Sequence, residues 1–306
     1  MKKTPLITLL AATFIAAAAI FTACQKGSDN PTGTTSPQDA VALQASAAAD
    51  DETDNVYNDV LTNVIGVNDD AGLGSGVGVF FTAPNSSGTP VNQFGSRADS
   101  VGHCFTLTVD PDRAGAFPKT ITLDFGSGCT ARDGHTRRGK IVTVYTGRLR
   151  DAGSKATATF DGFYFDSIKV EGSISVQNNS TGNGLAFTVA ITNGKLSDPS
   201  GDFVEINRTH NWAQTEGVST PHDLLDDVYS ITGTSAGTVQ ALGVTVQWTT
   251  EITQPLIRKL TCRWRVAGQL TITRNDKTAL LDYGNGDCDN KATITINGKV
   301  YNITLH

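Results

Sequence analysis

The chain has 306 residues and a formal net charge of −6, with 39% hydrophobic and 18% charged residues. This length allows one large β domain with a substantial core, and the hydrophobic fraction together with 31 glycines is typical of a globular protein and not of a disordered one. Because 24 basic residues face 30 acidic ones, the chain as a whole is not expected to bind a polyanion such as nucleic acid.

Residues 1–23 have the order of a secretory signal peptide: two lysines, an uncharged apolar run, then small residues. The sequence FTAC at 21–24 resembles a bacterial lipobox, and the resemblance implies cleavage before Cys24 and a diacylglyceryl thioether on its sulfur. The alternative is an uncleaved membrane anchor, since the apolar run approaches the ~20 residues that span a bilayer. We favour the lipoprotein because a simple anchor does not need a cysteine at this position.

Residues 24–49 are rich in Pro, Gly, Ser and then Ala, which predicts a flexible tether. Gln25 and Lys26 resemble the start of the signal that carries lipoproteins of Bacteroidota-type bacteria to the cell surface. The cell surface and the periplasmic face of the outer membrane both remain open as locations.

Residues 50–66 predict an amphipathic helix that ends at Gly66. Its apolar residues recur on one helical face: Val56, Val60, Leu61, Val64 and Ile65. Acidic residues gather at the start of this helix, where the helix dipole favours negative charge.

From residue 72 to residue 306 the apolar pattern changes to a period of two, interrupted by Gly, Asn-Gly, Asp-Gly and Asp-Pro turns. We predict a mainly β fold with about a dozen antiparallel strands, arranged as a β-sandwich or an incomplete β-barrel, with one N-terminal helix. No segment resembles a crossover helix, which excludes a doubly wound fold.

The segments 104–141 and 262–300 contain matching phrases, LDFGSGC and LLDYGNGDC, and predict a duplicated hairpin. A turn at Asn275-Asp276 places Cys262 opposite Cys288 or Asp289. Register and repetition favour two of the possible disulfides, and an exported protein would retain them. A zinc site is the alternative, but no C-x-x-C pair is present. The predicted disulfides are Cys104–Cys129 and Cys262–Cys288.

Candidate chemical sites are few. The five histidines form no metal-binding motif, and no G-x-S-x-G nucleophile motif occurs, so we assign no catalytic residue, no metal and no cofactor. His210 shares the alternation of apolar neighbours and is expected to point inward. The acidic residues within 282–290 suit calcium in type but not in EF-hand spacing, which favours a structural turn.

Arg263 and Arg265 alternate with Cys262, Trp264 and Val266, which predicts a strand with one core face and one cationic face. The cationic face is expected to be solvated, with acidic partners on neighbouring strands. The alternative is an anionic partner, such as an acidic glycan or lipid headgroups.

Taken together, the lipobox, the two repeated phrases and the segments LIRKLTCRW (256–264) and LLDYGNGDCDNKATITINGKVY (280–301) resemble a group of Bacteroidota outer-membrane lipoproteins. The resemblance implies a β domain anchored in the outer membrane through Cys24 and carries over no catalytic residue. We therefore expect a non-enzymatic protein that binds a glycan or protein partner, or that has a structural role in the envelope. A carrier of an apolar ligand in the periplasm is the alternative, and a glycan-active enzyme is a third hypothesis.

Overall fold

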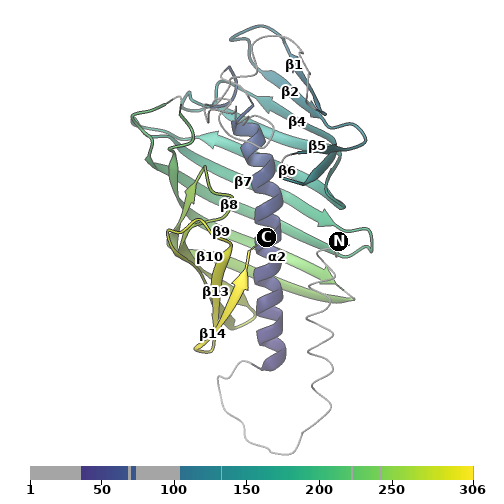
Figure 1. Cartoon of the computed structure of the whole chain (residues 1–306), viewed down its shortest axis with the longest axis vertical. Coiled ribbons are helices and arrows are strands. Elements are labelled where there is room, and N and C mark those ends of the chain that lie inside the picture. Colours follow the sequence, from purple (N-terminus) through teal and green to yellow (C-terminus); the bar gives the residue numbers. More distant parts are fainter. Residues whose placement is uncertain are drawn as a thin grey trace, which may run out of the picture.

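The computed structural model describes residues 36–67, 70–73, 104–131, 133–221, 223–241 and 243–305. The predicted signal peptide 1–23, the lipidation residue Cys24 and the tether as far as residue 35 lie outside the described residues. The described chain forms one long helix and a large antiparallel sheet (Figure 1).

The helix is α2 (Pro37–Ile65). The strands are, in chain order, β1 (Thr106–Asp110), β2 (Lys119–Asp124), β3 (Cys129–Thr130), β4 (Thr136–Tyr145), β5 (Lys155–Phe165), β6 (Ile168–Asn178), β7 (Ala186–Ser197), β8 (Phe203–Glu216), β9 (Val228–Ala241), β10 (Val244–Lys259), β11 (Ala267–Arg274), β12 (Lys277–Asn285), β13 (Lys291–Ile296) and β14 (Lys299–Thr304).

The strands form a single meander in which each strand pairs with its neighbour in the chain, except that β2 pairs directly with β4 and the short β3 pairs beside them. Tight turns make this possible. Asn297 and Gly298 both have positive φ values, 52° and 74°, as a two-residue hairpin between β13 and β14 requires. The sheet has 14 strands and does not close on itself, which confirms the predicted mainly antiparallel β fold and is consistent with a sandwich or an open barrel.

The sheet curves around α2, which runs along the long axis of the molecule (Figure 1). Seventeen of the 29 helix residues are buried, and they include consecutive positions such as Thr53 and Asp54. The partly exposed residues recur every three or four positions and form one stripe along the helix: Gln44, Ala48, Asp51, Asn55, Asn58 and Thr62. The helix therefore lies in the concave face of the sheet, and all of its surface except this stripe is largely covered.

The helix is longer than predicted. It begins at Pro37 and not at residue 50, so residues 37–49 of the predicted tether are helical. Ser36 caps the helix, with a capping box to Asp39. This first half is rich in alanine and shows no strongly polar face, because most of it packs against the sheet, yet alanine is the strongest helix former. The apolar residues that recur on one helical face at 56–65 therefore predicted only the second half of the helix.

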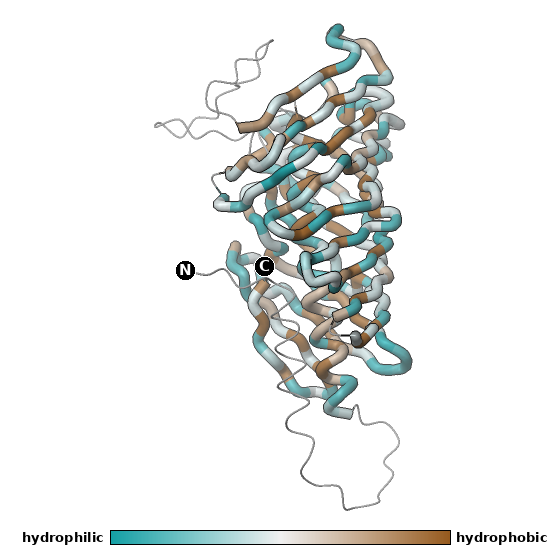
Figure 2. Tube along the Cα trace, turned by 90° about the vertical axis from the view of Figure 1, so that its right-hand side faces the viewer, coloured by the Kyte–Doolittle hydropathy of each residue, from teal (hydrophilic) through white to brown (hydrophobic). Residues whose placement is uncertain are grey.

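Inward-facing and outward-facing residues alternate along the strands, and Figure 2 shows this as alternating hydrophobic and hydrophilic segments of the tube. In β8, Val204, Ile206 and Trp212 are buried while their neighbours are exposed. Residues of α2 and of the inner sheet face form one continuous hydrophobic core. His210, on the inward side of β8 as expected, is buried in it.

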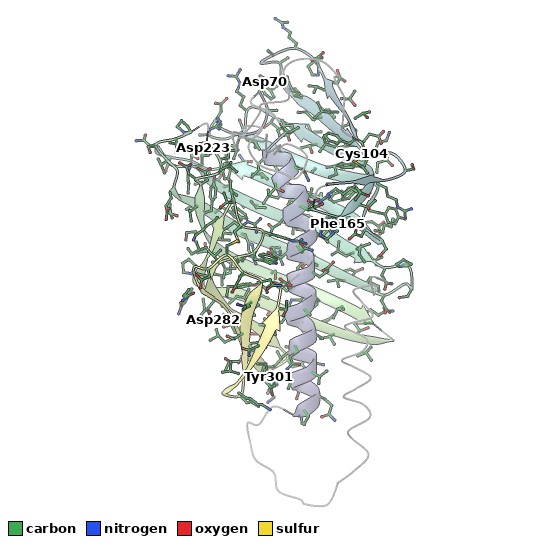
Figure 3. The ribbon with its side chains drawn as sticks, in the orientation of Figure 1. Asp70, Cys104, Phe165, Asp223, Asp282 and Tyr301 are labelled. Carbon is green, nitrogen blue, oxygen red and sulfur yellow. A yellow bond between two sulfur atoms is a disulfide. The ribbon has the colours of Figure 1, made fainter. Side chains whose placement is uncertain are left out.

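Both predicted disulfides are present, with Cα–Cα distances of 5.1 Å for Cys104–Cys129 and 5.8 Å for Cys262–Cys288. Figure 3 labels Cys104 of the first disulfide. It also labels Asp282, which lies in β12, the strand that leads to Cys288 of the second disulfide. The β11–β12 hairpin has the register that the Asn275-Asp276 turn predicts, with Leu270 opposite Leu281.

The two similar segments do not have the same topology after the second cysteine. Leu123 of β2 pairs with Ile141 of β4, whereas the matching Leu281 of β12 pairs with Ile294 of β13. The second copy therefore inserts a full strand where the first has only the two-residue β3. The two similar segments therefore share a disulfide-linked hairpin but differ in the strand that pairs with the second strand of that hairpin.

Candidate functional site

A buried polar cluster joins α2 to the inner face of the sheet. The Asp54 carboxylate accepts hydrogen bonds from Arg208 of β8 at 2.7 Å and from Arg265 at 2.6 Å. One turn earlier, Asp50 accepts from Arg208 at 2.9 Å and from the Ser235 hydroxyl at 3.0 Å. Because all five side chains are buried, the cluster sets the position of the helix in the sheet and presents no surface to a partner.

The predicted cationic strand face at Arg263 and Arg265 is wrong. β10 ends at Lys259 and β11 begins at Ala267, so both arginines lie in a connection and do not alternate across a sheet. Arg265 is 3% exposed and bound to Asp54, whereas Arg263 is exposed and donates to Asn55 Oδ1 at 2.8 Å. Their partners come from α2, which a pattern of neighbouring residues in one strand could not reveal.

The second half of α2 is held in a similar way. The Arg137 guanidinium, fully buried at the start of β4, donates to Asp59 of the helix (Nε–Oδ2 2.9 Å) and to Asp133 (Nη2–Oδ2 2.8 Å). The Tyr145 hydroxyl donates to the Val64 carbonyl at 2.8 Å. These contacts satisfy buried polar groups and therefore have a structural role.

The described histidines do not provide a reactive centre. His210 is 5% exposed, and burial together with the nearby Arg208 and Arg265 cations lowers its pKa well below the ordinary value, so the imidazole stays neutral. His135 lies at the surface, where its Nδ1 is 2.8 Å from Asp166 Oδ2. His103, His222 and His306 lie outside the described residues.

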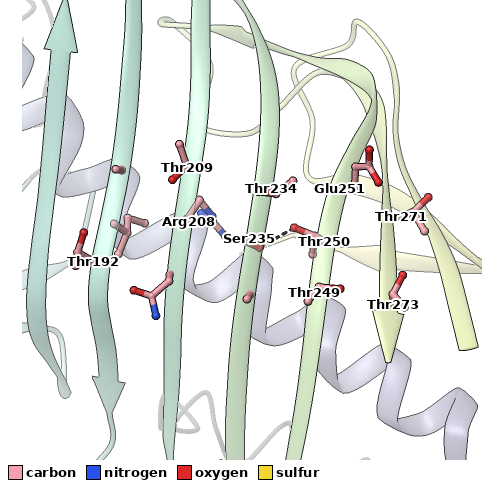
Figure 4. Close-up of a pocket in the computed structure, with 14 residues that line it drawn as sticks. Thr192, Arg208, Thr209, Thr234, Ser235, Thr249, Thr250, Glu251, Thr271 and Thr273 are labelled. Atoms are coloured by element: carbon pink, nitrogen blue, oxygen red, sulfur yellow. Dashed lines mark hydrogen bonds between the residues drawn. The ribbon is translucent and has the colours of Figure 1, made fainter. Parts of the chain in front are cut away.

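One groove of about 590 Å³ lies on the solvent-facing outer side of the sheet and crosses β7 to β11. Figure 4 shows Thr209, Thr234, Glu251 and Thr271 on neighbouring strands, with α2 behind the sheet. The strand register places these four side chains in one row, because Thr209 pairs with Thr234, Thr234 with Glu251, and Glu251 with Thr271.

A second row runs parallel to the first through the same groove. Asn207 pairs with Ala236, Ala236 with Thr249, and Thr249 with Thr273. Apart from Glu251, the outward side chains of the groove are uncharged, and within the described ranges the threonine hydroxyls make no hydrogen bond to the protein. Arg208, Ser235 and Thr250 border the same groove, but Arg208 donates to Asp50 of α2, and Ser235 bonds to Thr250, as the dashed line in Figure 4 shows. The groove is therefore a surface of free hydroxyls with small side chains at its floor.

Another groove, of about 660 Å³, lies beside the acidic turn that follows β12. Two of its three carboxylates have backbone partners: Asp282 accepts from the Gly284 N–H at 2.8 Å, and Asp289 accepts from the Lys291 N–H at 3.1 Å. The Lys291 amide and ammonium hold the pKa of Asp289 below its usual range. These two hydrogen bonds are those of a structural turn.

In the part of the chain that the structure describes, no group of three His, Cys, Asp or Glu side chains is arranged to hold a metal ion. Within the same ranges no helix combines the length and the apolar character that crossing a bilayer requires.

Comparisons with protein-family models, with curated proteins and with solved structures find no match for this chain. The candidate site therefore stands on its own geometry: an exposed, hydroxyl-lined groove on the sheet, opposite a tightly bonded interior.

Proposed function

We propose that this chain is a lipid-anchored, non-enzymatic binding protein of the bacterial outer membrane and that its outer groove binds a neutral polysaccharide. The observation that carries the proposal is the two parallel rows of mainly Thr, Asn and Ala side chains, with Glu251 in one of them, across β8 to β11. The two disulfides support export, since such bonds persist in oxidising compartments. Anchoring through Cys24 rests on the lipobox resemblance.

The chemistry of the groove favours a neutral ligand with many hydroxyl groups. Threonine hydroxyls and asparagine amides both donate and accept hydrogen bonds, as sugar hydroxyls do. An anionic polymer would meet the Glu251 carboxylate and no outward-facing cation among the lining residues. Neighbouring strands are about 4.8 Å apart, close to the length of one sugar unit in an extended chain, so a polysaccharide lying across the strands would meet a similar set of groups at each step.

The structure favours binding over the two other hypotheses. A carrier of an apolar molecule needs an apolar cavity, but α2 packs against the inner face of the sheet, and both grooves have polar side chains among their apolar ones. A glycosidase of the common type needs two carboxyl groups about 5–10 Å apart. The described lining of the outer groove contains one carboxylate, Glu251, and in the second groove Asp282 and Asp289 accept hydrogen bonds from the backbone of their own turn.

The proposal is tested with Ala236→Arg, which places a long side chain in the second row of the groove, between Asn207 and Thr249. The matched control is Ala213→Arg, because Ala213 is also an exposed alanine of the outer face but lies on β8 outside the groove. We expect Ala236→Arg to weaken retention by neutral polysaccharides in affinity electrophoresis by at least about tenfold and the control to leave it unchanged. Equal retention of the two variants, or preference for acidic polysaccharides, would overturn the assignment of the groove.

A further inference from the structure

Arg258 is a buried cation without a carboxylate partner. It lies on the inner side of β10 and is 5% exposed. One of its N–H groups donates to the Arg263 carbonyl, but its Nε has no hydrogen-bond partner, and no carboxylate of the described residues lies within ion-pair distance. Arg258 therefore differs from Arg208 and Arg265, each of which binds a helix carboxylate.

The neighbouring guanidinium groups of Arg265 and Arg208 also have buried N–H groups that make no hydrogen bond. Nε and Nη1 of Arg265 and Nε of Arg208 are buried without a partner. Among the fully buried groups, three arginines thus face the two carboxylates of Asp50 and Asp54, which leaves one positive charge in excess there, while the partly exposed Asp51 lies at the edge of the cluster.

Glu52, also buried in α2, does not correct this excess. Burial raises its pKa to about 8, because the carboxylate is desolvated and lies near Asp51, so the group is largely uncharged at neutral pH. Arg263 is close enough to oppose this shift, but it does not cancel it.

A buried guanidinium without a counter-charge is costly, because its hydration is lost and nothing replaces it. Burial lowers the pKa of Arg258 to about 10; the Asp54 carboxylate opposes this shift, and the Arg265 and Arg263 cations add to it. At neutral pH Arg258 therefore remains protonated, and the energetic cost of its charge persists in the folded protein. An anion among these N–H groups would remove that cost.

We propose that the N–H groups of Arg258 and Arg265 bind a small inorganic anion of the size of chloride in the interior, between α2 and the β10–β11 connection. The ligand must be small because both side chains are almost completely enclosed by the sheet and the helix. It must carry a single charge because the excess is one positive charge. This site is independent of the outer groove, and its anion would stabilise the fold without taking part in glycan binding.

The test is thermal unfolding of the full chain at constant ionic strength while sodium gluconate is replaced by sodium chloride, since gluconate is too large to enter the interior. We expect chloride to raise Tm by about 3–6 °C when it exceeds its dissociation constant tenfold. Arg258→Met should abolish this response. It should also unfold at the same temperature as the wild type in gluconate, or at a higher one, because the unpaired charge is gone.

The matched control is Arg263→Met, which removes an exposed arginine from the same connection and should keep the chloride response. A wild-type Tm that is equal in chloride and gluconate would overturn the proposal, as would a chloride response that persists in Arg258→Met. If Arg258→Met does not fold, a crystal of the wild type grown in sodium bromide decides the question. An anomalous peak within hydrogen-bond distance of Arg258 supports the site, and the absence of a peak there refutes it.

Discussion

Glu52 makes the stability of the protein depend on pH at the scale of a single side chain. Its pKa is about 8 in the folded protein and near 4.5 when unfolded, so the native state binds this proton more tightly. The stabilisation is complete below about pH 4.5 and is lost as the pH rises towards 8. Glu52→Gln keeps the uncharged form at every pH and should therefore be more stable than the wild type at pH 8, by on the order of 3 kcal/mol, and similar to it at pH 4.

Thermal denaturation of both proteins from pH 4 to 8.5 measures this effect. The difference between variant and wild type separates Glu52 from His210, whose lowered pKa acts in the opposite direction at acid pH. Glu251→Gln, at an exposed position, is the control and should follow the wild-type curve. A Glu52→Gln curve parallel to that of the wild type would contradict the prediction.

Asp54 is the carboxylate on which two buried arginines depend. Asp54→Asn leaves both Arg208 and Arg265 with less negative charge than they need, and we expect a loss of about 3–5 kcal/mol in the free energy of unfolding. Urea denaturation gives this value. The comparison is Asp39→Asn in the same helix, whose partner Arg274 is partly exposed and whose loss should cost at most about 1 kcal/mol. Equal losses for the two variants would show that burial of the pair has no effect.

At the scale of the elements, the Cys262–Cys288 disulfide closes the β11–β12 hairpin across a sequence separation of 26 residues. In the chain-entropy model a loop of this length contributes about 3.5 kcal/mol by restricting the unfolded chain. Replacing both cysteines by alanine should lower the free energy of unfolding by that amount, and reduction of the wild type should have a comparable effect. A double variant as stable as the wild type would contradict this prediction. It would mean that the hairpin stays ordered in the unfolded state, so that the disulfide restricts that state no further.

Gly139 permits the β-bulge at which β4 pairs with β5. Its φ is +76°, and a Cβ atom there would lie 2.0 Å from the Gly162 carbonyl oxygen, which is part of the backbone and cannot rotate away. Gly134 has a similar φ of +81° but open space around it. Gly134→Ala should therefore cost about 1 kcal/mol from backbone strain alone, and Gly139→Ala clearly more. Thermal unfolding compares them, and equal costs would contradict the steric argument.

At the scale of the whole molecule, α2 is joined to the inner face of the sheet by buried ion pairs, and the outer face of the sheet is exposed to solvent. The helix that occupies the interior begins at Pro37, close in sequence to Cys24, so a lipid at Cys24 would be connected directly to the core element. The outer groove lies on the opposite side of the sheet from this helix (Figure 4).

Protease treatment of intact and lysed cells tests the location of the domain. We expect the wild type to be recovered with the outer membrane, and Cys24→Ser to be recovered in the soluble fraction because the lipid cannot be attached. Degradation of the wild type on intact cells would place the groove outside the cell, and protection until lysis would place it in the periplasm. Membrane association that persists in Cys24→Ser would contradict the lipid anchor.

The sequence by itself determined the features that depend on near neighbours in the chain. A period of two predicts strands wherever one face is buried, and short turns impose antiparallel pairing, so the fold class followed from the pattern. The two disulfides followed from the spacing of the cysteines around a turn. The second half of α2 followed from its apolar spacing.

Tertiary structure alone decided the features that depend on distant residues. Most alanines at 37–49 become buried in a helix because a sheet formed by later residues curves around it. Arg265 is internal because Asp54 lies opposite it, although 211 residues separate them in the chain. The rows of the outer groove exist only once five strands are in register, since each strand contributes few of the lining residues. Contacts between distant segments leave no periodic signal in either segment, and this is why pattern analysis could not find them.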